Sequence, residues 1–162
     1  MATDRTRTAP APDRALDPAR VVALLPERLG DWKRVSLEPA SAGRTSGGVA
    51  ARGGPTLSAD YERNALAATL SIDTSSSGNA SVAQWNGPPV DSATATGREA
   101  LYKRDGRIYR ERFDKASHES SVTCTLGNGL VLVAISGSAD LEALRGLVDA
   151  VDLKRAAEMR RR

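Results

Sequence analysis

The chain has 162 residues, 40% of them hydrophobic and 4% aromatic, and its 23 basic and 20 acidic residues leave a formal net charge of +3. That length fits one globular domain, and the few aromatic rings and small charge excess argue against a surface that binds nucleic acid. A single cysteine excludes an internal disulfide, and a single histidine argues against a zinc site built from the usual ligands.

The first residues predict a disordered arm that leads into a short helix. Residues 1–16 mix Pro, Ala, Arg and Asp without periodicity, so they bury too little apolar surface to offset the entropy lost on ordering. Asp17 and Pro18 then predict a helix start, because Asp suits the N-cap and Pro the first helical position. Pro26 and Gly30 are expected to end this helix.

A strand and a long loop are predicted next. Trp32 opens a strand over 32–38, and a bulge in this strand would decide whether Trp32 faces inward or whether Val35 and Leu37 do. Residues 39–55 are rich in Gly, Ala and Ser and have no apolar period, which is typical of a long loop.

A hairpin and a helical turn are predicted in the middle of the chain. Residues 57–61 and 66–72 alternate apolar and polar side chains, so they predict two antiparallel strands joined at Arg63 and Asn64. Residues 81–85 then predict a helical turn against the sheet, which Gly and Pro residues end.

Two tight turns predict two further hairpins. Asp105-Gly106 and Asn128-Gly129 both suit a two-residue type I′ turn, because both central positions must tolerate positive φ. Around the first turn the opposed pairs are Arg104 with Arg107, Lys103 with Ile108, Tyr102 with Tyr109, and Glu99 with Arg112. Around the second turn the opposed pairs are Leu126 with Val131, Cys124 with Val133, and Val122 with Ile135.

A final helix is predicted from Ala139 or Asp140. Its apolar residues recur at helical spacing, and they are Leu141, Leu144, Leu147, Val148 and Val151, with Leu153 near the end. Because this helix directly follows the last strand, we expect it to cover the face that carries Val122, Cys124 and Leu126. Residues 154–162 are expected to continue as a fraying basic tail.

These elements predict an α+β fold for residues 17–153. Three hairpins without a long crossover imply one antiparallel sheet of about six to seven strands. An N-terminal and a C-terminal amphipathic helix are expected to bury their apolar faces on this sheet, within a single domain.

No residue cluster with catalytic spacing stands out. Cys124 is predicted to be a core residue, because its neighbours are apolar and a reactive thiol needs an electropositive, partly exposed setting. His118 lies in a polar turn and is not expected to pair with Cys124. Glu99, Glu111 and Asp114 have Arg or Lys beside or across from them, so solvated ion pairs are expected there.

The basic hairpin over 98–115 is the strongest candidate for a binding surface. Its candidate binding residues are Arg104, Arg107, Arg110, Arg112, Tyr102 and Tyr109. A cationic strip beside tyrosines can bind an acidic partner or a nucleic-acid backbone, and salt should weaken such binding. The alternative is a charged edge that only discourages strand-to-strand aggregation.

The order of several motifs resembles a known group of proteins. The carrying stretches are "LLPERLGDWKR", "ADYER", "TLSIDT", "ALYKRDGRIYRERFD" and "LGNGLVLVAISGSADLEALRGLVDAVDL", within residues 20 to 153. They are similar to small bacterial domains of unknown function, and their element order resembles the PsbP/Mog1-like α/β sandwiches. The resemblance implies a binding or assembly factor without catalysis, and its motifs are structural, so no functional residue is carried over.

The sequence thus predicts a non-catalytic binding or assembly module that is not an enzyme and uses no cofactor or metal. Its partner is expected to be a protein, with an acidic one favoured by the basic hairpin, rather than nucleic acid, and no membrane span is expected. The alternative is a carrier that holds a small molecule or lipid between sheet and helices. No apolar leader is present, so the chain as written is expected in the cytoplasm, or in the periplasm or envelope if a leader or anchor has been removed.

Overall fold

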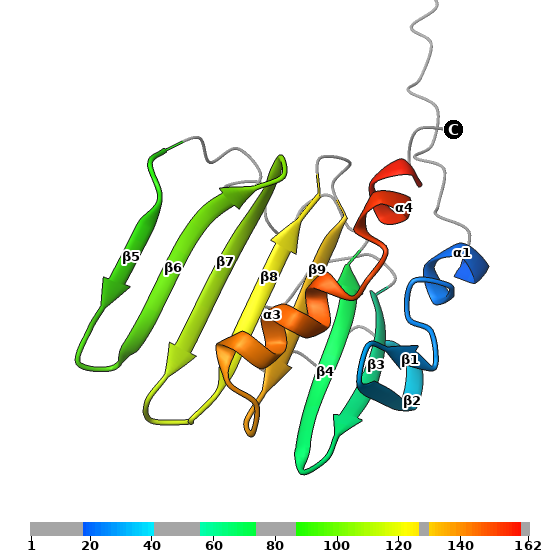
Figure 1. The fold of residues 1–162 in the computed structure, drawn as a ribbon, viewed down its shortest axis with the longest axis horizontal. Helices are drawn as coiled ribbons and strands as arrows, with labels where there is room; N and C mark the ends of the chain where they lie inside the picture. Colours follow the sequence, from blue (N-terminus) through cyan, green and yellow to red (C-terminus); the bar gives the residue numbers. More distant parts are fainter. Residues whose placement is uncertain (1–17, 41–55, 74–86, 127–129, 160–162) are drawn as a thin grey trace, which may run out of the picture.

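The fold is one antiparallel sheet with its helices on one side (Figure 1). The structure, a computed structural model, describes residues 18–40, 56–73, 87–126 and 130–159. The strands are β1 (Arg28–Leu29), β2 (Trp32–Ala40), β3 (Thr56–Arg63), β4 (Leu66–Asp73), β5 (Val90–Ala93), β6 (Gly97–Arg104), β7 (Arg107–Asp114), β8 (Ser120–Thr125) and β9 (Val131–Ser136). They are arranged in the order β1-β2-β3-β4-β9-β8-β7-β6-β5.

The predicted fold class is confirmed, but the predicted strand number is too small. The described residues form 9 strands, because β1 and β5 add one strand at each edge of the sheet. β1 has only 2 residues, and all four residues of β5 are exposed. Neither strand has alternating apolar and polar residues, so the hydrophobic periodicity of the sequence does not predict them.

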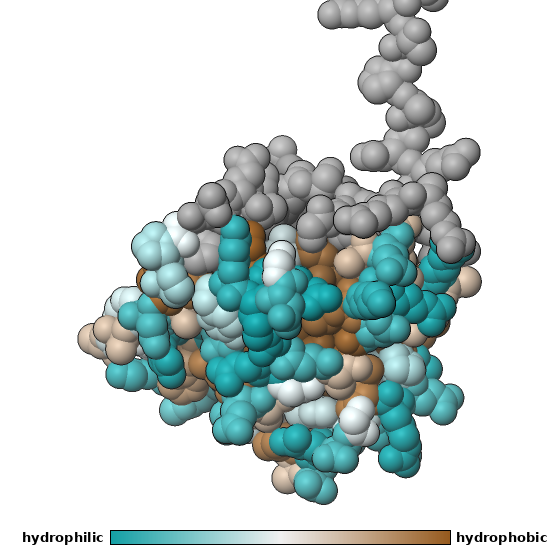
Figure 2. All heavy atoms as spheres, turned by 45° about the horizontal axis from the view of Figure 1, so that its top comes forward, coloured by the Kyte–Doolittle hydropathy of each residue, from teal (hydrophilic) through white to brown (hydrophobic). Residues whose placement is uncertain are grey.

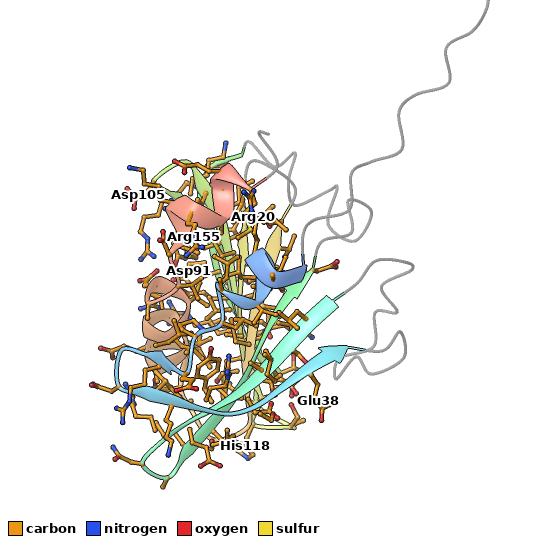
Figure 3. The ribbon with its side chains drawn as sticks, turned by 90° about the vertical axis from the view of Figure 1, so that its right-hand side faces the viewer. Arg20, Glu38, Asp91, Asp105, His118 and Arg155 are labelled. Carbon is orange, nitrogen blue, oxygen red and sulfur yellow. The ribbon has the colours of Figure 1, made fainter. Side chains whose placement is uncertain are left out.

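The helices are α1 (Pro18–Val22), α3 (Leu141–Asp149) and α4 (Leu153–Glu158). α3 lies across β7, β8 and β9, as predicted for the helix that follows the last strand. Figure 3 shows α3 and α4 on the same side of the sheet, whereas Glu38 of β2 projects on the other side. We call these two sides the helix side and the outer face. Figure 1 also shows that β5 and β6 extend beyond the end of α3.

The C-terminal region differs from its prediction. Instead of one helix that reaches Val151, α3 ends at Asp149, and the Asp152 carboxylate accepts a hydrogen bond from Arg155 N to start α4. Ala156 and Met159 are buried, so the chain does not fray from residue 154. An aspartate at an N-cap favours a new helix start, and apolar residues spaced three apart give α4 a buried face.

The two tight-turn hairpins have different outcomes. The Asp105-Gly106 register is confirmed, and φ is 51° and 74° at these two residues. The Asn128-Gly129 register is wrong by one residue, since Cys124 lies opposite Leu132 and not Val133. Leu126 N donates to Leu130 O at 2.9 Å, which joins the two residues that directly follow β8 and precede β9.

That one-residue shift exchanges the two faces of β9. Leu132 and Ala134 face the core at 0% exposure, whereas Val133 and Ile135 lie half-buried on the outer face. Because β9 is apolar at successive positions, its residue pattern could not select the register. The predicted cover of Val122, Cys124 and Leu126 by α3 is confirmed, and all three belong to the hydrophobic core.

The first strands contain a bulge in β2 and a tight turn between β3 and β4. The register between β2 and β3 shifts between Arg34 and Ser36, which is the bulge considered above. Trp32 is therefore buried at 2% exposure, and Val35 is 52% exposed. The β3–β4 hairpin is confirmed, but Arg63 pairs with Leu66, so its turn is one residue later than predicted.

Several predicted segments lie outside the described residues. These are the arm over 1–16, most of the loop over 39–55, the turn over 81–85, and the last residues of the tail. Within the described part of the chain, no helix has the length and apolar character needed to cross a bilayer.

Candidate functional site

The structure divides the six candidate binding residues between the two sides of the sheet. Tyr102 pairs with Tyr109 and Arg104 with Arg107 on the helix side. Arg110 and Arg112 alternate with them along β7, so their side chains lie on the outer face. The prediction of one cationic strip is therefore wrong, because successive side chains of a strand point to opposite sides of the sheet.

The two tyrosines form a stacked pair within the sheet. Their ring centroids are 5.4 Å apart and the rings are inclined by 5°. Tyr109 is only 1% exposed, so it cannot serve as a contact surface for a partner. Tyr102 is half-buried, and the Arg104 guanidinium lies 4.5 Å from the Tyr109 ring centroid. The stacked pair thus forms a rigid floor of aromatic rings, and the Arg104 guanidinium packs against it.

A buried carboxylate lies beside this floor. Glu111 of β7 is 3% exposed, and it accepts a 2.6 Å hydrogen bond from the Tyr102 hydroxyl. The Arg145 guanidinium of α3 donates to both carboxylate oxygens, at 2.6 Å and 2.9 Å. The predicted solvated ion pair is therefore wrong for Glu111, because its partner comes from a helix 34 residues away.

The other two carboxylates fit their prediction better. Glu99 accepts from Arg110 at 3.0 Å on the outer face, and both side chains are more than one third exposed. Asp114 accepts hydrogen bonds from the backbone N–H groups of Ala116 and Ser117, which closes the turn between β7 and β8.

Two titratable groups of this cluster are shifted in opposite directions. Burial raises the pKa of Glu111, but hydrogen bonds from Arg145 and Tyr102 outweigh burial and hold the pKa below its ordinary value of 4.5. Burial, followed by the hydrogen bond to Glu111, raises the pKa of Tyr102 to about 12. At neutral pH an ionised carboxylate is therefore bound by a protonated phenol and a guanidinium.

The cluster opens into a groove of about 460 Å³ at the end of the sheet that extends beyond α3. The groove is lined by Pro89, Val90, Asp91, Arg98, Ala100, Tyr102, Arg104, Glu111 and Arg145. Figure 2 shows hydrophilic residues over much of the visible face, with apolar residues between them. Three guanidinium groups and one phenol therefore surround a surface groove whose floor is β-sheet.

Each arginine of the groove is held by a carboxylate from a neighbouring element. Arg98 donates to Asp91 of β5 at 3.0 Å and 2.8 Å, and Arg104 donates to Asp149 of α3. Arg145 is held by Glu111. A guanidinium has five N–H donors, so these carboxylates fix each group and leave other donors available to a ligand.

A second hollow, of about 830 Å³, lies beside the edge of the sheet at β2. Its lining residues are Pro26, Glu27, Arg28, Lys33, Arg34, Val35, Ser36 and Leu37. Each of these residues is exposed or half-buried. None of them is a buried charged residue like Glu111. The groove beside α3 is therefore the more highly organised of the two.

The two residues considered for nucleophilic chemistry lie in different environments. Cys124 is fully buried, and burial raises the pKa of its thiol, so its assignment to the core is confirmed. His118 is exposed in a turn with φ of 56°, at the end of the sheet opposite to Asp105 (Figure 3). Among the described residues, no cluster of three His, Cys, Asp or Glu side chains could hold a metal ion.

The Cys124 environment predicts slow labelling. We expect the thiol to resist a thiol reagent in the native state and to react after denaturation. Cys124→Ser should lower the free energy of unfolding by about 1 kcal/mol, because the hydroxyl is buried but has the cross-strand Tyr109 hydroxyl beside it. Rapid native labelling, followed by mass spectrometry, would contradict this prediction.

Comparisons with protein-family models, curated proteins and solved structures find no match to this chain. The resemblance to PsbP/Mog1-like sandwiches therefore stays a prediction. The site described above rests on the geometry of the chain itself.

Proposed function

We propose that the protein is a non-catalytic binding module, and that the groove beside α3 receives a carboxylate-bearing segment of a protein partner. The observation that supports this proposal is the extension of the sheet beyond its helix layer. This extension leaves three carboxylate-held guanidinium groups around Tyr102 at a surface groove. Arginine is well suited to bind carboxylates, because its planar N–H donors match two oxygens at once.

The internal ion pairs also favour selective binding over binding to any polyanion. Arg98, Arg104 and Arg145 are balanced in charge by Asp91, Asp149 and Glu111. A groove with no large charge excess attracts DNA or RNA weakly, because nonspecific binding to phosphates depends on cation excess. It can still discriminate a carboxylate by directed hydrogen bonds.

The carrier alternative has less support. The space between α3 and the sheet is filled by buried side chains, with Val122, Cys124, Leu144 and Leu147 all at 0% exposure. The two hollows described above are both lined by several charged residues, which suit a lipid chain poorly.

A peptide selection tests the proposed function. The immobilised protein is used to select binders from a displayed library of random peptides with free C-termini. We expect the enriched peptides to carry Asp, Glu or a required C-terminal carboxylate. Arg98→Ala should weaken their binding about tenfold or more, since it removes one directed charged donor.

Arg112→Ala is the matched control, because Arg112 is an exposed arginine of the same hairpin on the outer face. It should leave peptide affinity unchanged. Enriched peptides that lack carboxylates, or that bind the Arg98→Ala protein at full strength, would contradict the proposal.

A further inference from the structure

The outer face of the sheet has its charges separated by strand order. Each row of side chains that crosses the sheet can be followed through the strand register. One row reads Asp60, Thr69, Ile135, Ser121 and Arg112 from β3 to β7. The next row reads Glu38, Ser58, Ser71, Val133, Thr123 and Arg110 from β2 to β7. Both rows carry an acid on β2 or β3, an apolar residue on β9 and an arginine on β7. Beyond Arg112, the first row continues to Glu99 on β6.

Neighbouring residues extend the same separation. Glu62 of β3 and Asp73 of β4 add acids at one end of the outer face, and Lys103 of β6 adds a cation at the other. Lys33, opposite Glu62, is a cation at the acidic end. Glu99, which pairs with Arg110, and Asp114, the last residue of β7, are acids at the basic end. The end at β2 and β3 therefore stays net acidic, and the end at β6 and β7 stays net basic.

We propose that this outer face is the interface of a homodimer in which two sheets pack face to face. β9 is the fifth of the 9 strands, so a two-fold axis parallel to it places β3 of one copy over β7 of the other. The same axis places β2 over β6 of the second copy. Acidic ends then lie over basic ends twice, so the face is complementary to itself.

The centre of the proposed interface is apolar. Val133 and Ile135 of β9 are half-buried in the single chain and would meet their own copies across the axis. Thr123 and Ser71 flank Val133 on either side, which gives a flat surface of short side chains. Two sheets pack in this way at a spacing of about 10 Å with their strands aligned within about 30°. Charge complementarity and this central column both favour a second copy as the occupant.

This interface goes beyond the proposed groove and does not depend on it, since the groove lies on the helix side. The two can be tested separately. A protein with the outer face disrupted should keep its affinity for selected peptides. A protein with Arg98→Ala should keep its oligomeric state.

Charge reversal tests the interface. We expect the full chain to sediment at twice its monomer mass at concentrations of about 100 µM, with dissociation on dilution. The acidic-end variant Glu38→Lys/Glu62→Lys and the basic-end variant Lys103→Glu/Arg112→Glu should each raise the dimer dissociation constant about tenfold or more. All four side chains are exposed, so circular dichroism should show both variants folded.

Mixing the two variants is the decisive measurement. Glu38→Lys/Glu62→Lys makes both ends of the outer face basic, and Lys103→Glu/Arg112→Glu makes both ends acidic. Each variant therefore repels its own copies but attracts the other variant, so an equimolar mixture should form a mixed dimer. Lys154→Glu/Arg155→Glu, two exposed residues of α4, is the control with equal charge change and should leave the dimer intact. The proposal would be overturned if the wild type is monomeric, if the charge reversals leave the dimer dissociation constant unchanged, or if the mixture of variants stays monomeric.

Discussion

Arg145→Ala is expected to lower the free energy of unfolding by about 3 kcal/mol at neutral pH. The substitution leaves Glu111, which is 3% exposed, with only the Tyr102 hydroxyl as a hydrogen-bond donor among its described side-chain partners. An ionised carboxylate that loses its counter-ion inside a protein is costly, because water no longer solvates it. Alanine favours the helix, so α3 itself should not be weakened.

The loss should depend on pH in a definite direction. In the wild type the folded pKa of Glu111 is lowered, so its contribution is present above the unfolded pKa and is lost as pH falls through the folded pKa. In Arg145→Ala, burial still raises the pKa of Glu111, and only the Tyr102 hydrogen bond and the Arg98 charge remain to lower it. The difference between the two proteins should therefore shrink as pH falls below about 4.

Urea denaturation at several pH values measures this effect. Arg145→Ala/Glu111→Gln should recover part of the lost stability, because the neutral amide no longer carries a buried charge. Lys154→Ala, whose side chain is exposed on α4, should cost less than about 0.5 kcal/mol. Equal losses for Arg145→Ala and Lys154→Ala would show that Glu111 does not need the Arg145 guanidinium.

Gly97→Ala is the second substitution with a large expected effect. A Cβ at Gly97 would lie 2.0 Å from the backbone carbonyl oxygen of Phe113 on the neighbouring strand β7. Backbone atoms cannot rotate away as a side chain can, so β6 and β7 must separate at this point. We expect a loss of about 2 kcal/mol in the free energy of unfolding. Because Arg98 follows directly, peptide binding in the groove should weaken as well.

Gly146→Ala provides the same chemical change in open space. Gly146 lies in α3 with no atom within 4 Å of its added Cβ. This variant should gain about 0.5 to 1 kcal/mol, because alanine is a better helix former than glycine. Thermal and urea denaturation of both variants would check the pair. A Gly97→Ala protein as stable as Gly146→Ala would contradict the close approach of the two strands.

If the groove and the outer face both act as proposed, the two sides of one sheet have separate roles. The helix side would hold a partner segment next to α3, and the outer face would join two copies. A dimer would then carry two grooves, one on the helix side of each copy, and both would face away from the interface. Such a dimer would bind a bivalent partner, one with two carboxylate-bearing segments, more tightly than either groove alone, provided that the partner can span the two sites.

Local sequence patterns determined much of the fold of this chain. The Asp105-Gly106 turn set the β6–β7 register, because few other dipeptides accept two positive φ angles in succession. Alternating residues placed Ala59, Tyr61 and Leu70 in the core. The basic hairpin lies where the sequence predicts it, but its six candidate residues do not share one surface, because strand alternation sends Arg110 and Arg112 to the other side.

Only the tertiary structure decided the organisation of the site. The partners of Arg104 and Glu111 come from α3, and residues so distant in the chain leave no spacing signal. The register of β9 was undecided in the sequence, because successive apolar residues let either face turn inward. Packing under α3 selected Leu132 and Ala134 for the core. That choice left Val133 and Ile135 on the outer face, between its acidic and basic ends.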